Sequence, residues 1–285
     1  MAQFRCDTAP MRRHGRVESA AGLGRHGHGA WLYSDEAEFR AGALEYLGDG
    51  PGLDQRMLYV GAGTIEKLRA DLVGLPDLDG LLGDGALRIM PLEAVYEVGV
   101  GIDPMAQLAM YTATTKTALM DGYSGLRVLA DVTPLVLDPE LWRAHTHWEA
   151  VADRYMAKNP MSALCCYDRR RLPDEILRDV ACVHRSSNGS TAMAPFRLFA
   201  GREGLSLAGE VDSFAADHLR RLLASAVPAE GDVTLELDEL RFIDHNGVLA
   251  IAELARELRQ TGRAVRFLGA PRSFDRVTDL LEVEL

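Results

Sequence analysis

Hydrophobic positions between residues 26 and 185 follow two patterns that alternate along the chain. Runs that are apolar throughout predict buried strands at MLYVGAG, ALRIMPLEAVY, GLRVLADVT and SALCCYD. Segments with helical spacing separate these runs, including one that Ser34 or Asp35 can cap and one over 104–120 that Asp103 opens. Because strands that are apolar on both faces need cover on both sides, this alternation predicts an α/β domain with a mostly parallel sheet between helices.

The pattern changes at several points and predicts four segments. Residues 1–25 are rich in Arg, Gly and Ala without periodicity, so they predict a mobile leader ahead of a domain over 26–185. Residues 186–195 are small and polar with Gly and Pro, which predicts a linker. Residues 196–285 predict a second compact domain, with strands over RLFAGREG, LSLAGEVD, DVTLELDEL and RAVRFLGA and three amphipathic helices.

Composition and charge narrow the class of protein. The chain of 285 residues is 47% hydrophobic, which is enough for two packed cores. A net charge of −11 argues against a nucleic-acid-binding face, and the short clusters Arg12-Arg13 and Arg169-Arg170-Arg171 predict solvated surface. Apolar runs stay well below the roughly 20 residues of a membrane span, and the N-terminus lacks the apolar core of a secretory signal.

The cysteines indicate a compartment. Cys6, Cys165, Cys166 and Cys182 show neither a CxxC motif nor the spacing of a secreted disulfide framework. Three of them fall in or near apolar segments and predict small buried side chains. We therefore expect a protein of the reducing cytoplasm.

The C-terminal third carries motifs of a known regulatory domain. The stretches LAGEVDSFAADHLRRLL (207–223), DVTLELDELRFIDHNGVLAIAEL (232–254) and AVRFLGA (264–270) occur in an order that resembles the STAS domain. Sulfate transporters and bacterial anti-sigma factor antagonists share this domain. The resemblance implies a small mixed sheet with helices on one side, and an anti-sigma factor or a related regulatory protein as partner.

The junction FIDHNGV stands where the STAS resemblance places the switch site. In many antagonists this junction reads Asp-Ser-Ser-Gly or Asp-Ser-Thr-Gly, and a partner kinase phosphorylates the second hydroxyl residue. Here Asp244 and Gly247 match, but His245 and Asn246 occupy the hydroxyl positions. Since an amide cannot form a phosphoester, we expect no phosphorylation by the usual chemistry. We predict that the stretch from Asp244 to Val248 caps the following helix and binds the partner in its uncharged state.

Residues 26–185 resemble the MEDS domain, a sensory module of methanogens and methylotrophs. The residues that carry the resemblance are His28 with LYSDEAEF, then MLYVGAG, GLRVLADVT, SALCCYD and VACVHR. The family is similar to RecA-type ATPase cores and is thought to sense small molecules or signals. The expected fold is therefore α/β, with an N-terminal mostly parallel RecA-like sheet domain and a C-terminal STAS domain.

The glycine-rich stretch GAGTIEKLR departs from both nucleotide-binding fingerprints. A P-loop needs a Lys-Ser/Thr pair directly after its glycines, whereas Lys67 comes later and in a helix. Glu66 occupies the third glycine position of the GxGxxG pattern. Asp131 ends a strand where an ATPase holds its metal-binding acid, and we interpret it as a relic or a turn former. We expect neither ATP hydrolysis nor a required cofactor; a small-molecule ligand or a non-hydrolysed nucleotide stays open.

Two further groups of residues bear on chemistry. His145, His147 and Glu149 lie in HTHWE, which is not HExxH, and on a helix His147 points away from the other two, so we expect no metal site. A ligand pocket is predicted where parallel strands end, with aromatic residues around a few polar groups. Its candidates are Trp31, Tyr33, Trp142, Trp148, Cys165, Tyr167 and Asp168. The alternative is that the aromatic residues are core and Asp168 caps a turn.

These observations predict a non-enzymatic cytoplasmic signalling regulator, whose sensory domain controls a STAS domain of the anti-sigma factor antagonist type. One alternative is a nucleotide-binding descendant of ATPases. Tight ATP binding that is lost when Gly61 or Gly63 is changed would favour this alternative. The other is a scaffold that self-associates through STAS surfaces in a stress complex, and light scattering would detect such a homo-oligomer.

Overall fold

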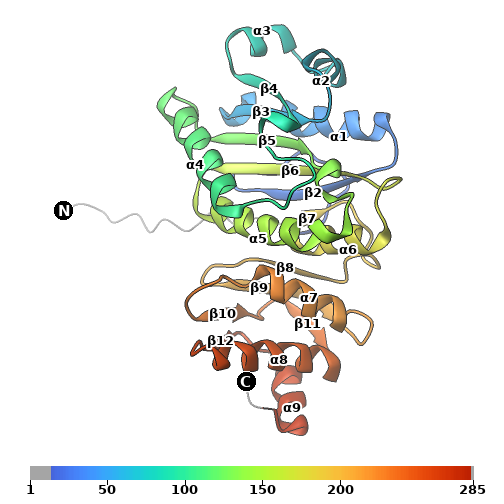
Figure 1. Cartoon of the computed structure of the whole chain (residues 1–285), viewed down its shortest axis with the longest axis vertical. Coiled ribbons are helices and arrows are strands. Elements are labelled where there is room, and N and C mark those ends of the chain that lie inside the picture. The colour runs from blue at the N-terminus through green and yellow to red at the C-terminus, as the bar shows by residue number, and fades with distance from the viewer. Residues whose placement is uncertain (1–13, 284–285) are drawn as a thin grey trace, which may run out of the picture.

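The computed structural model describes residues 14–283 and places them in two units that stack along the long axis of the molecule (Figure 1). The N-terminal unit is a parallel sheet between two layers of helices, and the C-terminal unit is a smaller mixed sheet with its own helices. This architecture confirms the predicted α/β fold class. Cys6, Arg12 and Arg13 lie outside the described residues.

The N-terminal sheet has seven strands within the described part of the chain, all parallel, in the order β1-β7-β2-β6-β5-β3-β4. Its four central strands are buried along almost their whole length, which explains why their sequences are apolar on both faces. The strands are β1 (Gly15–Arg16), β2 (His28–Tyr33), β3 (Arg56–Gly61), β4 (Leu87–Pro91), β5 (Leu126–Asp131), β6 (Met161–Asp168) and β7 (Ser186–Ser187).

Helices cover both faces of this sheet. One layer consists of α1 (Glu36–Gly48), α2 (Ile65–Asp71) and α3 (Leu78–Gly83), and the other of α4 (Pro104–Met120), α5 (Trp142–Lys158) and α6 (Asp174–Val183). Asp35 caps α1 and Asp103 caps α4, which confirms both predicted helix starts. Short 3-10 turns complete the connections: η1 (Pro51–Leu53), η2 (Leu92–Ala94), η3 (Thr133–Val136) and η4 (Pro139–Leu141).

Residues 14–25 differ from the predicted mobile leader. Gly15–Arg16 pairs with β7, and Ala20 and Leu23 are buried. Arg127, which is fully buried on β5, donates from Nη1 to the carbonyl of Leu23 at 2.9 Å. A buried guanidinium needs acceptors, and the main chain of this segment supplies one of them.

The predicted linker over 186–195 begins as part of the sheet. Ser186–Ser187 forms β7 between β1 and β2. The side chain of Asn188 accepts from the N–H of Leu32 at 2.8 Å and donates to its carbonyl at 2.9 Å, as a paired strand would. Small polar residues here therefore bond to a strand edge instead of forming a free connection.

The C-terminal unit is the predicted mixed sheet. Strand β8 runs antiparallel to β9, as expected for the predicted strand pair, and the other strands are parallel in the order β11-β9-β10-β12. The strands are β8 (Phe196–Ala200), β9 (Leu205–Val211), β10 (Val233–Glu236), β11 (Leu240–Ile243) and β12 (Val265–Leu268). The helices are α7 (Ala216–Ala226), α8 (His245–Gln260) and α9 (Arg272–Leu281).

Helices α5 and α6 lie between the two units and pack against β8 and α7 (Figure 1). One hydrophobic cluster runs from the N-terminal sheet through these helices into the C-terminal core. Polar contacts add to it, because Arg154 donates to the carbonyl of Ala226 at 2.7 Å and His218 lies 2.6 Å from Asp179. The two units therefore share one continuous core. Among residues 14–283, every helix is too short or too polar to cross a membrane.

Candidate functional site

One face of α5 carries three buried polar residues. His145, Glu149 and Asp153 are spaced four residues apart, so the helical repeat aligns them toward the N-terminal sheet. His145 Nε2 lies 3.1 Å from Glu149 Oε1, which confirms that these two residues share a face. His147 points the other way, where its Nδ1 lies 2.6 Å from the carbonyl of Ser225 in α7.

Three other elements bring side chains to this face. Strand β2 begins with His28, and β6 contributes Cys165 and Tyr167. Ala30 is the register partner of Cys165, so His28, two residues earlier, lies on the same face of the sheet. His184 follows the last residue of α6. We call His28, His145, Glu149, Cys165, Tyr167 and His184 the buried cluster.

Glu149 is at the centre of the buried cluster. Its Oε2 lies 3.1 Å from His28 Nε2, 3.3 Å from His184 Nε2 and 3.7 Å from Cys165 Sγ. Its Oε1 accepts a hydrogen bond from the Tyr167 hydroxyl at 3.0 Å, which in turn lies 2.9 Å from His145 Nε2. Each of these side chains is buried, so both carboxylate oxygens are enclosed by protein side chains.

The outer nitrogens of two histidines face acceptors. His184 Nδ1 lies 2.7 Å from the carbonyl of Val180, and since a carbonyl only accepts, Nδ1 carries the proton. His28 Nδ1 lies 3.3 Å from Asp153 Oδ1. The other oxygen of Asp153 accepts from the backbone N–H of Ala200 at 2.6 Å. Asp153 therefore connects the buried cluster to β8 of the C-terminal unit.

Burial and charge together set the protonation of the buried cluster. Burial opposes a charge on His28, but hydrogen bonds to Asp153 and Glu149 outweigh it and raise the pKa of His28. Burial also opposes a charge on Glu149, but His184, His145 and His28 hold its pKa well below the ordinary range. Burial and the neighbouring Glu149 raise the pKa of Cys165. The cluster therefore contains a carboxylate and a neutral thiol.

The structure does not bring the seven predicted pocket residues together. Trp31 and Tyr33 pack with α1 on one face of the sheet, whereas Trp148, Cys165 and Tyr167 belong to the other face. The alternation of side chains along β2 and β6 causes this separation, since Trp31 pairs in register with Cys166. The sequence pattern identifies the strand ends but not the face on which each side chain lies.

The remaining predicted pocket residues have separate surroundings. Trp148 stacks on Tyr111 with ring centroids 5.9 Å apart, as a core residue does. Trp142 lines an interdomain cleft of about 330 Å³ together with Asp179 and Arg221. Asp168 accepts from the backbone N–H and from the guanidinium of Arg170, so it caps a turn. The core and turn alternatives therefore describe Trp148 and Asp168.

His28 and His184 are the residues that the site prediction missed. Both occur in the motifs that resemble MEDS, but spacing alone did not relate them to Glu149. Their approach depends on β2 lying beside β6 and on the end of α6 returning to that face. The expectation of no metal site at HTHWE weighed Glu149 only with His145 and His147. The structure instead places Glu149 with His28, Cys165 and His184, and the ligand-type atoms of these four residues lie within 4.8 Å of one another.

In the glycine-rich stretch that follows β3, side chains of the stretch itself contact its backbone. Thr64 caps α2 and accepts from the N–H of Lys67 at 3.3 Å, and the Lys67 side chain lies against Gly63. Asp131 accepts from the N–H and hydroxyl of Thr133 and from the Tyr33 hydroxyl at 3.1 Å. Asp131 therefore has the contacts of a turn former.

The second site is the corner where β11 ends and α8 begins, and we call residues Asp244 to Val248 the α8 corner. Asp244 Oδ1 accepts from the N–H groups of Asn246 and Gly247 at 2.9 and 3.0 Å, which confirms the predicted helix cap. His245 is exposed, Asn246 is half-buried and Val248 is buried. A Cβ at Gly247 would lie 2.6 Å from Ile243 Cγ1, so only glycine allows α8 to approach β11 this closely.

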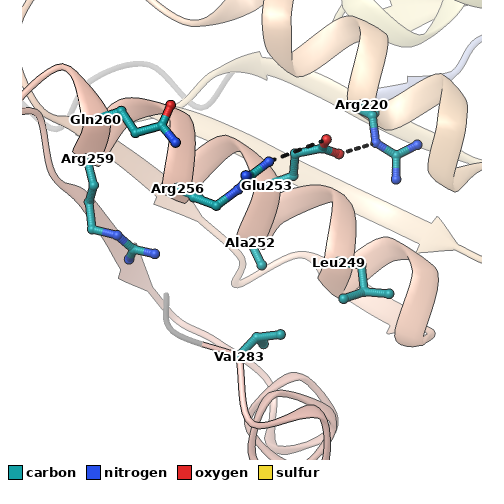
Figure 2. Close-up of a pocket in the computed structure, with 8 residues that line it drawn as sticks. All are labelled: Arg220, Leu249, Ala252, Glu253, Arg256, Arg259, Gln260 and Val283. Atoms are coloured by element: carbon teal, nitrogen blue, oxygen red, sulfur yellow. Dashed lines mark hydrogen bonds and ion pairs between the residues drawn. The ribbon is translucent and has the colours of Figure 1, made fainter.

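A groove follows this corner along α8. Figure 2 shows Leu249, Ala252 and Val283 on its apolar side and Glu253 between Arg220 and Arg256. Glu253 lies 2.6 Å from Arg220 Nε and 3.9 Å from Arg256 Nη2. The groove has a volume of about 730 Å³, and Arg259 and Gln260 complete its lining. It thus combines an apolar strip with three arginines and one glutamate.

Comparisons with known proteins bear on both units. The family model described as MEDS, the methanogen/methylotroph, DcmR sensory domain, matches residues 27–185, and the STAS domain matches residues 204–284. Among solved structures, the chain is similar to the flagellar accessory protein FlaH from Methanocaldococcus jannaschii. The identity is 13%, the match covers 65% of this chain and 77% of that one, and the TM-score is 0.35. A comparison with curated proteins finds no match.

Proposed function

This chain belongs to the MEDS family of sensory domains and carries a STAS domain after it. We therefore propose that a signal at the N-terminal unit, which we call the sensory unit, controls binding of an anti-sigma factor by the C-terminal unit, which we call the STAS unit. The two domains together are those of a signalling regulator of the anti-sigma factor antagonist type. In the proposal the protein acts by binding, not by catalysis.

The two-sided contact of Asp153 carries this proposal. One oxygen of Asp153 faces His28 in the buried cluster, and the other accepts the N–H of Ala200 in β8. Strand β8 pairs with β9, and Val211 at the end of β9 accepts the N–H of Asp244 at 3.0 Å. A change at His28 thus has a continuous path of hydrogen-bonded strands to the α8 corner. Coupling through such a path requires two arrangements of the elements that it joins.

The α8 corner supports a permanently binding-competent surface. Phosphorylation would add roughly −1.5 to −2 charges and oppose docking, but neither His245 nor Asn246 offers the hydroxyl that relatives use. Phe242 and Leu249 flank the corner with 48% and 38% of their surfaces exposed. Exposed large apolar side chains beside a polar corner are typical of a protein-binding site.

The groove behind the corner favours a partner with an acidic segment. Its three arginines outnumber its one glutamate, Glu253, which pairs with Arg220 and Arg256. They lie beside the apolar strip of Leu249, Ala252 and Val283 (Figure 2). Charge complementarity of this kind favours one class of partner and speeds encounter. We therefore place the anti-sigma factor across the corner and along α8.

Calorimetry with purified anti-sigma factors from the same organism tests this assignment. We expect one of them to bind the full chain, and Leu249→Glu to weaken binding by at least tenfold because it puts a charge on the contact face. Val73→Glu is the matched control, since Val73 is 69% exposed on the sensory unit, and it should bind like the wild type. Equal affinities of the Leu249→Glu variant and the wild type, or no binding at all, would contradict the proposal.

A further inference from the structure

We propose that the buried cluster is a Zn²⁺ site with four ligands: His28 Nε2, Glu149 Oε2, Cys165 Sγ and His184 Nε2. These side chains come from β2, α5, β6 and the end of α6, and all are buried. The inference goes beyond the proposed function, because it gives the sensory unit a ligand of defined chemistry. It does not depend on any anti-sigma partner.

The distances between the ligand atoms match a tetrahedral metal site. Zn²⁺ bonds of about 2.0–2.1 Å to nitrogen or oxygen and about 2.3 Å to sulfur separate tetrahedral ligand atoms by roughly 3.3–3.6 Å. From Glu149 Oε2, the separations are 3.1, 3.3 and 3.7 Å to His28, His184 and Cys165. Cys165 Sγ lies 3.8 Å from His28 Nε2. All four ligand atoms lie within 4.8 Å of one another, so shifts of about an ångström or less bring them to this geometry.

The contacts around the four ligands are those of a second coordination shell. Metal-binding histidines typically present their other ring nitrogen to a carboxylate or a backbone carbonyl. His28 presents Nδ1 to Asp153, and His184 presents Nδ1 to the carbonyl of Val180. Tyr167 donates to Glu149 Oε1, which leaves Oε2 as the ligand oxygen. His28, His184 and Glu149 are thus oriented from behind toward one common point.

His184 supplies an independent indication of a cation. Its Nδ1–H is used on Val180, so in the neutral imidazole Nε2 carries a lone pair. That lone pair faces Glu149 Oε2, another acceptor, at 3.3 Å, and His184 Nε2 is a buried atom without a hydrogen-bond partner. Two buried acceptors that face each other are unfavourable, and a cation between them binds both.

The donor set also selects the metal. Imidazole and thiolate ligands suit Zn²⁺, whereas Mg²⁺ and Ca²⁺ prefer oxygen ligands. On binding, the Cys165 thiol releases its proton to solvent, and the two histidines coordinate as neutral imidazoles. One thiolate and one carboxylate then balance the two positive charges of Zn²⁺. A site with zero net charge is compatible with its complete burial.

The test uses the full chain, stripped of metal and titrated with Zn²⁺ against a chromogenic chelator. We expect one Zn²⁺ per wild-type chain. Co²⁺, used as a spectroscopic probe, should give a thiolate-to-cobalt charge-transfer band. His184→Gln should lower the Zn²⁺ affinity by more than the 10–100-fold typical of outer-shell changes.

Neighbouring cysteines provide a matched pair of variants. Cys165→Ser should abolish the cobalt band, whereas Cys166→Ser should keep it, because Cys166 is equally buried but lies on the opposite face of β6. Circular dichroism checks that both variants fold. The proposal is overturned if the wild type binds no stoichiometric Zn²⁺, or if the band survives in Cys165→Ser. Neither result bears on anti-sigma binding, so this failure is distinguishable from failure of the proposed function.

Discussion

Asp153 accepts the backbone N–H of Ala200 at 2.6 Å, and through this bond the polar face of α5 reaches the first strand of the C-terminal unit. Both groups are buried, and the same carboxylate faces His28 with its other oxygen. Domains within a chain commonly meet through modest polar contacts and move relative to one another. Here one continuous core and a buried charged hydrogen bond join them, which suits a signal passed between domains.

Replacing Asp153 tests the energetic role of this bond. We expect Asp153→Ala to lower the free energy of unfolding by about 1–3 kcal/mol, because the buried N–H of Ala200 loses its acceptor. Asp153→Asn should cost less, since the amide oxygen still accepts from Ala200. Urea denaturation of both variants and the wild type measures the difference. Equal stability of Asp153→Ala and the wild type would show that water or another group replaces the bond.

Arg127 should contribute strongly to the stability of the sensory unit. It is fully buried, donates to the carbonyls of Tyr46 and Leu23 at 2.7 and 2.9 Å, and lies over the Tyr46 ring. Arg127→Met leaves these acceptors unpaired, so we expect a loss of about 3 kcal/mol or more in the free energy of unfolding.

The exposed Arg88 on β4 provides the control for Arg127. Arg88→Met should change the free energy of unfolding by less than about 0.5 kcal/mol in the same urea experiment. A loss in Arg127→Met no larger than in Arg88→Met would contradict the assigned role.

Gly247 tests the close approach of α8 to β11. A Cβ there would lie 2.6 Å from Ile243 Cγ1 and 2.8 Å from Val211 Cγ1, so we expect Gly247→Ala to destabilise the protein by about 1–3 kcal/mol. Gly48 at the end of α1 has open space around its Cβ position, and Gly48→Ala should be neutral or slightly stabilising. Thermal unfolding distinguishes the two. An equal rise in melting temperature for both variants would refute the packing argument.

The burial of Asp131 should make the free energy of unfolding depend on pH. Burial raises the pKa of Asp131, and hydrogen bonds from Thr133 and Tyr33 only partly oppose this effect. Above an unfolded-state value of about 4, the folded protein then binds more protons than the unfolded chain, so stability falls as the pH rises through the raised pKa.

Asp131→Asn isolates this contribution. The amide oxygen can still accept from Thr133, and the amide nitrogen can donate to the Tyr33 hydroxyl. We expect the variant to lose this part of the pH dependence when the free energy of unfolding is measured between pH 4 and neutral pH. An unchanged slope in that interval would assign the dependence to other groups.

Much of this fold could be predicted because periodicity reports burial directly. The apolar runs of β3, β5 and β6 and the caps at Asp35 and Asp103 appeared where the pattern placed them. The helix cap at Asp244 could be predicted equally well, since an acidic residue directly before an apolar helix typically caps that helix.

The buried cluster was harder to predict from the sequence, because it depends on the order of the strands in the sheet. His28 and His184 lie more than 150 residues apart in the chain, and only the pairing of β2 with β6 and the return of α6 bring them to Glu149. Likewise, the split of Trp31 from Cys165 follows from the alternation of faces along paired strands. The docked residues 14–25 were missed because their partner is the buried Arg127, whose burial a charged residue type does not indicate.

The central claim is that the α8 corner binds its partner without a phosphorylation switch. Incubation with a cognate anti-sigma kinase and ATP, followed by peptide mass spectrometry, tests it most directly. Wild type should carry no phosphate on residues 244–247 and should keep its affinity for the partner. Asn246→Ser, which restores a hydroxyl at the family position, should become phosphorylated and release it. Phosphate on the wild-type corner together with loss of partner binding would contradict the account.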